Sequence, residues 1–374
     1  MHGKMMVFCT NVILLLFFSL IVILSVKGKK STINALIIFH SLNAVKIVFL
    51  CVWAIHKTGT IDLNYLQFPD EYYYLAESHI GGAVSNLYHL LVYGMKEIGF
   101  SIGSLKMINI LVTSFAVVRL YTLRNLVRDK NRYITHLLVL GGIFFLHVTY
   151  YSIFVLKDAL FFYVTVEFLI QLIKRSRNNR WGLMIFLCVI LMLIRPPMIL
   201  GFMVFLFDKN WCIQWKRLLL FFILGAIFIR YGGQYYDYER KFYGYVAAGL
   251  SENLHVEGSK GERKEYAQTY LLNDSKAYLR LVLGNIRNTT SIFYQTDITC
   301  QLILFLECCT VFYLLIIRKN IVRIIRYWPV LAVAFLYFIF GSLTLYNIRY
   351  NLFPVAFLIY LLIFVNSKPL VNFK

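Results

Sequence analysis

Long apolar runs separated by short basic clusters dominate this chain. Runs from Val12 to Val26, Leu302 to Ile317 and Val330 to Tyr346 approach the roughly 20 apolar residues that cross about 30 Å of hydrocarbon. The pattern predicts an all-α fold, a polytopic transmembrane bundle of about 11 helices. Their expected ranges are 7–26, 32–55, 102–122, 134–152, 156–173, 181–195, 197–207, 217–231, 300–317, 328–346 and 349–366.

The sequence Arg195-Pro196-Pro197 interrupts this pattern. Because 197–207 is too short to cross alone, it is expected either as a pass or as a broken, re-entrant helix surrounded by protein or water. The alternation of the later basic clusters favours a pass, which places the N-terminus outside and the C-terminus inside. The first run is expected to remain as a helix, since lysines follow it where a signal peptide would have its cleavage site.

Composition agrees with a membrane protein and excludes a nucleic-acid partner. Of 374 residues 60% are hydrophobic and 15% charged, and the mean hydropathy is +0.68. The formal charge is +20, but the basic residues lie in short clusters between apolar runs, as in cytoplasmic loops under the positive-inside rule. We therefore predict one integral membrane domain, 1–374. The clusters are Lys27/Lys29/Lys30, Arg124/Arg128/Lys130/Arg132, Lys174/Arg175/Arg177/Arg180, Lys209/Lys216/Arg217, Arg318/Lys319/Arg323/Arg326 and Lys368/Lys374.

Most acidic residues fall instead in two segments, 56–100 and 231–299, which are predicted as outer loops. The second is rich in tyrosine as well as in charge. Aromatic rings mixed with acids and amides suit sugar binding, since rings stack on C–H faces while polar groups bond to hydroxyls. The alternative is a set of interfacial tyrosines on a solvated loop.

The first outer loop carries the acidic motif Phe68-Pro69-Asp70-Glu71-Tyr72-Tyr73-Tyr74. Two adjacent carboxylates at a membrane surface suit a general base or a metal clamp acting on a hydroxyl-rich substrate. A divalent cation held by Asp70 and Glu71 stays an open alternative, and so does a solvated loop with interfacial tyrosines. The stretch 82–98 has apolar residues at helical spacing, which predicts a helix lying in the interface.

Several ionisable residues are expected at one depth, near the outer ends of different helices. Arginine and lysine there could bind the phosphate of a lipid-linked substrate. Alternatively, each cation extends to headgroups or pairs with a carboxylate such as Asp158. The predicted phosphate-binding residues are Lys157, Arg195, Arg230 and Arg349. Lys46, Lys106, Glu167 and Glu307 also fall within apolar runs and receive no specific role.

The acidic motif, Lys157-Asp158, Arg195-Pro196 and the closing Asn347-Ile348-Arg349-Tyr350-Asn351-Leu352-Phe353-Pro354 resemble a bacterial polytopic glycosyltransferase of the C-type fold. Members of that family use polyprenyl-phosphate sugars as donors. The resemblance implies that Asp70 is the catalytic base, that Glu71 is its neighbour or a metal ligand, and that Arg349 faces the donor phosphate. Asp158, Tyr350 and His79 are expected to support the site. One departure is a second helix before the acidic loop, where the family usually has one.

The chain also resembles O-antigen and capsule polymerases, which join lipid-pyrophosphate-linked oligosaccharides. Both resemblances imply a multi-pass protein of the bacterial inner membrane with its site on the periplasmic side. The expected function is transfer of lipid-linked sugars at the outer leaflet during cell-surface polysaccharide synthesis. Polymerisation of repeat units is the alternative, and a lipid-linked sugar flippase is third because paired broken helices in matching halves are not evident. The expected partners are polyprenyl-linked sugars and membrane lipid, and no organic cofactor is predicted.

Overall fold

The computed structural model describes residues 2–66, 69–75, 87–126, 129–174 and 181–194, together with positions 215, 219, 223, 298, 301–306 and 308–309. These residues form helices and connecting turns, and no strand occurs among them. The chain divides into two compact units, and all the helices named below belong to the first, Met1–Pro196 with Ile363–Asn372.

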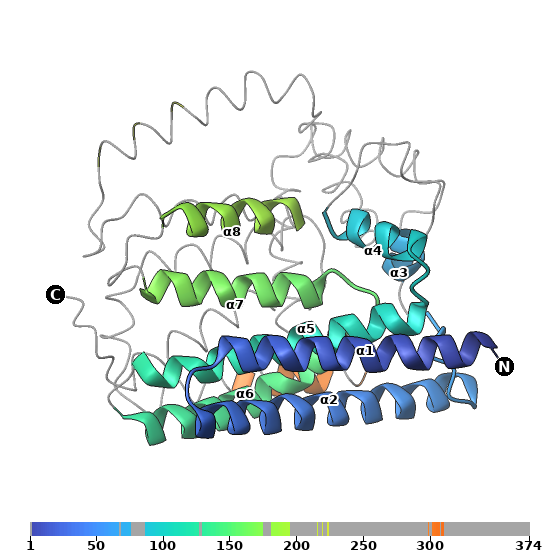
Figure 1. The fold of residues 1–374 in the computed structure, drawn as a ribbon, viewed down its shortest axis with the longest axis horizontal. Helices are drawn as coiled ribbons and strands as arrows, with labels where there is room; N and C mark the ends of the chain where they lie inside the picture. Colours follow the sequence, from blue (N-terminus) through green and yellow to red (C-terminus); the bar gives the residue numbers. More distant parts are fainter. Residues whose placement is uncertain are drawn as a thin grey trace, which may run out of the picture. The chain divides into compact units, whose positions relative to one another are not determined.

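Six helices of the first unit confirm six predicted ones, with ends that differ by a few residues. Successive long helices run in opposite directions along the bundle (Figure 1). Of the remaining predictions, 197–207, 328–346 and 349–366 lie outside the described residues. The few described positions within 217–231 and 300–317 are helical. The six helices are α1 (His2–Ser25), α2 (Lys29–Thr58), α5 (Ile102–Thr122), α6 (Lys130–Ser152), α7 (Asp158–Lys174) and α8 (Trp181–Ile194).

Within the described part of the chain, three helical segments are long and apolar enough to cross a membrane: Val7–Ser25, Lys29–Thr58 and Ile102–Asn125. Gly182–Ile194 is apolar but shorter. Among the described side chains of α1, which are mostly apolar, about half are exposed and only Val22 is buried. An exposed apolar surface of this kind is compatible with contact to lipid.

The helix α5 is the centre of the unit, in contact with α1, α2, α6 and α7. Buried residues of α2 recur every three or four positions and so form one stripe along that helix. The N-terminal part of this stripe packs with α1 and α5 in one apolar cluster. Its buried members are Val22, Val26, Ala35, Phe39, Leu111, Phe115 and Val118.

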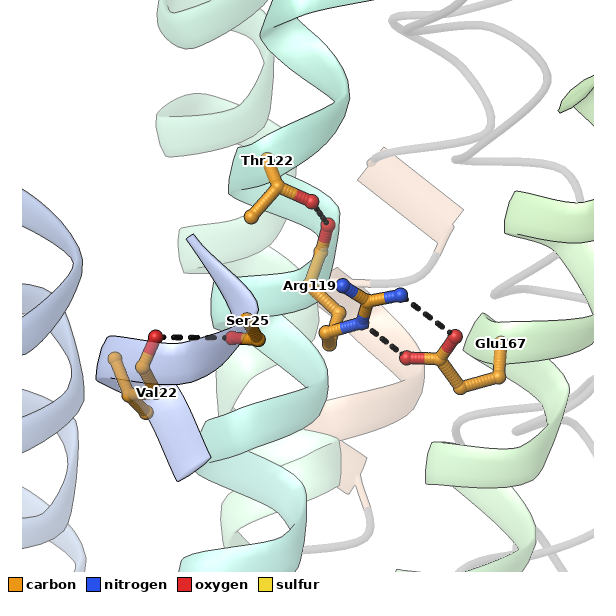
Figure 2. A network of polar contacts seen from close by, with 5 residues as sticks. All are labelled: Val22, Ser25, Arg119, Thr122 and Glu167. Atoms are coloured by element: carbon orange, nitrogen blue, oxygen red, sulfur yellow. Dashed lines mark hydrogen bonds and ion pairs between the residues drawn. The ribbon is translucent and has the colours of Figure 1, made fainter. Parts of the chain in front are cut away.

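An ion pair joins the last turn of α5 to the middle of α7 (Figure 2). The Arg119 guanidinium donates from Nη2 to Glu167 Oε2 at 3.0 Å and from Nε to Oε1, so both carboxylate oxygens are engaged. The two side chains are only 16% and 11% exposed. Two-point pairing of this kind offsets the cost of placing each charge in an apolar interior. Glu167 therefore has a defined partner on a neighbouring helix.

Two basic clusters lie at one end of the bundle. Arg124, in the turn η2 (Leu123–Leu126) after α5, donates from Nη2 to Ser31 Oγ at 2.7 Å, close to the start of α2. Its guanidinium also lies 3.9 Å from the centroid of the Tyr121 ring. The turn from α1 to α2 and the turn after α5 therefore share what we call the basic end, as the positive-inside pattern requires.

We predict that removing one member of the Arg119–Glu167 pair destabilises the protein more than removing both. Arg119→Met leaves a buried carboxylate without its partner and should lower the free energy of unfolding by about 3 to 5 kcal/mol. Arg119→Met combined with Glu167→Leu should recover most of that loss. Thermal unfolding in detergent micelles measures both, with Lys130→Met on the exposed surface as the control. Single variants that unfold like the parent protein would contradict a stabilising pair.

Candidate functional site

The acidic motif lies on a short helix, α3 (Pro69–Leu75), which the sequence analysis did not predict. Proline at the first position and carboxylates in the first turn are typical of a helix start. The helix α4 (Leu87–Glu97) follows, so the described part of the stretch 82–98 is helical as predicted, while its place in the interface stays a prediction. Both lie at the end of the bundle where α5 begins (Figure 1), which we call the acidic end.

Glu71 is fully buried, at 0% exposure, and its Oε1 accepts the backbone N–H of Val155 at 2.8 Å. Tyr74, one turn later, is also buried, whereas Tyr72 is 59% exposed. The motif is thus partly inside the protein and is not a fully solvated loop. The backbone of Asp70 belongs to the same helix, but its side chain lies outside the described set.

The partner of Glu71 belongs to the connection between α6 and α7, in which residues 153–156 are completely buried. A buried loop needs hydrogen-bond partners for its backbone, because water cannot supply them. Asn109 of α5 donates from Nδ2 to the carbonyl of Phe154 at 2.6 Å and to that of Leu156 at 3.2 Å. Side chains from α3 and α5 therefore fix this loop from two directions.

Lys157 and Asp158 follow this loop directly, as the sequence analysis expected for the start of the fifth predicted helix. The Lys157 carbonyl accepts the N–H of Phe161 at 2.9 Å, which begins α7. Asp158 is buried and lies in the first turn, where the helix dipole stabilises a negative charge. The position of the α6–α7 loop thus determines where Lys157 and Asp158 lie.

On the α5 side, Lys106 is buried and donates from Nζ to the backbone carbonyl of Tyr65, in the segment before α3. Its ammonium group lies 5.8 Å from the centroid of the Phe154 ring. The carboxylates of Glu71 and Asp62 lie close enough to act on it electrostatically. The acidic end therefore brings an ammonium group and carboxylates together among buried apolar residues.

Tyr88 of α4 closes the cluster. Its hydroxyl accepts from Asn109 Nδ2 at 3.1 Å, and its ring packs edge-on against Tyr74 with centroids 5.1 Å apart. Burial raises the pKa of Tyr88, and the negative charges of Asp158 and Glu71 raise it further, against the opposing effect of the Asn109 hydrogen bond. Tyr88 is therefore a neutral phenol at physiological pH.

Of the predicted site residues, the structure brings Glu71, Lys157 and Asp158 to the acidic end, together with the backbone of Asp70 on α3. The others, Arg195, Arg230, Arg349, Tyr350 and His79, lie outside the described residues. Asn109 was not predicted as a site residue, and Lys106 was predicted without a role. Their signal was the spacing of Lys106, Asn109 and Thr113, which places three polar residues on one face of an apolar helix.

No group of three histidine, cysteine or acidic residues that could hold a metal occurs in the described part of the chain. Oε1 of Glu71 is already engaged by a backbone amide. Among the described residues, Glu71 therefore holds the α6–α7 loop, and no set of metal ligands forms around it.

The described residues form helices without strands, three of them apolar and long enough to span a membrane, and several buried ionisable groups meet at the acidic end. Comparison with known protein families, with curated proteins and with solved structures gives no match for this chain.

We predict that Glu71→Ala lowers the free energy of unfolding by about 1 to 3 kcal/mol, because the Val155 N–H is then left buried without its acceptor. Glu71→Gln keeps an acceptor oxygen and should lose less than half as much. Tyr72→Ala, on the exposed side of the same helix, is the matched control and should change stability by no more than about 0.5 kcal/mol. Denaturant unfolding of the purified protein measures all three. Equal losses for Gln and Ala would show that the negative charge, not the hydrogen bond, matters.

Proposed function

We propose that the protein is a membrane glycosyltransferase that uses lipid-linked sugars at the outer leaflet of a bacterial inner membrane, in cell-surface polysaccharide synthesis. About 11 spans with the acidic end outside complete the proposed topology. The observation that supports this best is that α3, α5 and the start of α7 bring buried Glu71, Lys106 and Asp158, with half-buried Lys157, to the end of the bundle that carries Asp70. Buried ionisable groups at one end of a helical membrane bundle are a mark of a functional site.

In the proposed reaction, Asp70 takes the proton of an acceptor hydroxyl. The acceptor oxygen forms a bond to the anomeric carbon of the donor sugar, with inversion. The bond from that carbon to the phosphate oxygen breaks, and the electron pair leaves with the lipid phosphate. Lys157, together with Arg195, Arg230 and Arg349, stabilises the developing negative charge.

The described contacts give Glu71 and Asn109 a positioning role in this proposal. Both bind the backbone of the α6–α7 loop, whose next residue is Lys157. A phosphate-binding cation is effective only when its position is fixed before the charge develops. Tyr88, neutral and bonded to Asn109, closes the same cluster against water.

The proposed topology predicts that the two ends of the bundle react with a membrane-impermeant maleimide from opposite sides. In a variant without native cysteines, Thr60→Cys at the acidic end should be labelled in cells whose inner membrane is intact. Lys29→Cys at the basic end should be labelled only after that membrane is opened. Both positions are exposed, so access within the protein is comparable. The reverse pattern would place the acidic end in the cytoplasm and exclude transfer at the outer leaflet.

Asp70→Asn should reduce glycosyl transfer by about 100-fold to 10,000-fold, because the amide cannot accept the acceptor proton. The measurement is the lipid-linked and surface glycan profile of a deletion strain complemented with each variant. Glu71→Gln is the matched control at the neighbouring position. It keeps an acceptor for the Val155 N–H, so its expression in the deletion strain should restore the missing sugar.

The same profile separates the transferase from the polymerase. Polymer that lacks one sugar in the deletion strain supports the transferase, whereas single repeat units in place of chains would indicate a polymerase. Full restoration of the glycan profile by Asp70→Asn would show that Asp70 is not the catalytic base. Equal membrane levels of each variant, checked by immunoblot, exclude loss of protein as the cause.

A further inference from the structure

A second polar cluster lies between α2 and α5, one helical turn beyond Asn109 on α5. Lys46 is completely buried, at 0% exposure, and donates from Nζ to Thr113 Oγ1 at 2.7 Å and to Ser114 Oγ at 3.2 Å. The Thr113 hydroxyl donates to the Asn109 carbonyl of its own helix at 2.9 Å, so it accepts from the lysine. Nothing in the proposed transfer reaction uses this cluster.

The cluster lies near the middle of both apolar spans. Lys46 is 17 residues beyond the start of α2 (Lys29–Thr58), which is about 26 Å along a helix that rises about 1.5 Å per residue. Thr113 is similarly central in α5 (Ile102–Thr122). Ionisable residues at this depth are costly, so they are functional candidates.

Asn43 is the second feature of the cluster. It is 2% exposed, and neither Oδ1 nor Nδ2 has a hydrogen-bond partner among the described residues. It belongs to the buried stripe of α2, one turn before Lys46 and one turn after Phe39, which packs with α5 residues. Side chains three apart on a helix are neighbours, so its amide faces the same space as the lysine. A buried amide without partners is expensive unless something binds it.

We propose that Asn43 and Lys46, with Ser114, bind a small monovalent anion of the halide class between α2 and α5. The groups available are an ammonium, an amide NH₂ and a hydroxyl, and N–H and O–H donors replace the hydration shell of an anion. The flanking residues on the stripe, Phe39 and Leu50, are apolar and buried, which strengthens the attraction of the ammonium for a negative charge. The bound anion ties α2 to α5 at mid-depth.

The test is the melting temperature of the purified full chain in detergent, in sodium chloride and in sodium gluconate at equal ionic strength. Chloride should raise the melting temperature by about 3 to 6 °C, because it binds the folded state. Asn43→Leu should abolish the difference between the two salts, since it removes the unpartnered amide. Ser41→Ala, on the exposed side of α2, is the matched control and should keep the full difference.

Lys46→Met should also abolish the chloride effect, and Asn43→Leu carries the test if the lysine variant does not fold. Equal melting temperatures of the parent protein in the two salts would overturn the proposal and indicate water at the amide. A chloride effect that persists in Asn43→Leu would overturn it as well. The proposal does not depend on glycosyl transfer, so neither result bears on Asp70.

Discussion

A buried stretch of irregular backbone must find a hydrogen-bond partner for each of its polar groups, and the loop between α6 and α7 is where this constraint is strongest. Residues 153–156 are sealed from solvent, and side chains from two other helices supply the partners. Glu71 accepts one N–H, and Asn109 donates to two carbonyls. The position of α3, the start of α7 and the placement of Lys157 with Asp158 all depend on these few bonds.

The polar residues of α5 specify its neighbours one at a time. Lys106 binds the segment before α3, and Asn109 binds the α6–α7 loop. Further along α5, Thr113 accepts a hydrogen bond from Lys46 of α2, and Arg119 pairs with Glu167 of α7. Apolar packing between helices tolerates sliding, because methyl and methylene groups fit in several registers. A hydrogen-bonded polar group in an apolar surround does not tolerate sliding, because a shift that breaks its bond leaves a buried donor or acceptor unsatisfied. Because these four contacts lie at successive positions along α5, they favour one register of this helix against each neighbour.

Periodicity and apolar length predicted α5 at its observed bounds, and the other five long helices within a few residues, because burial in an apolar surround leaves a strong local signal. Local signals also marked α3: Pro69 and the acids after it are a helix start, but seven residues give too little periodicity. The site contacts were not predictable. Glu71 and Val155 are 84 residues apart, and Asn109 and Phe154 are 45 apart, so only the packed helices bring them together.

The Arg119–Glu167 pair has a consequence for how the chain enters its membrane during synthesis. The two residues are 48 positions apart, so at about 5 to 20 residues per second the ribosome makes the arginine about 2 to 10 s before the glutamate. For that interval the last turn of α5 carries a cation whose partner does not yet exist, and such a cation extends to lipid headgroups instead. The contact between α5 and α7 can therefore form only after α7 has been made, which links the two helices during biogenesis.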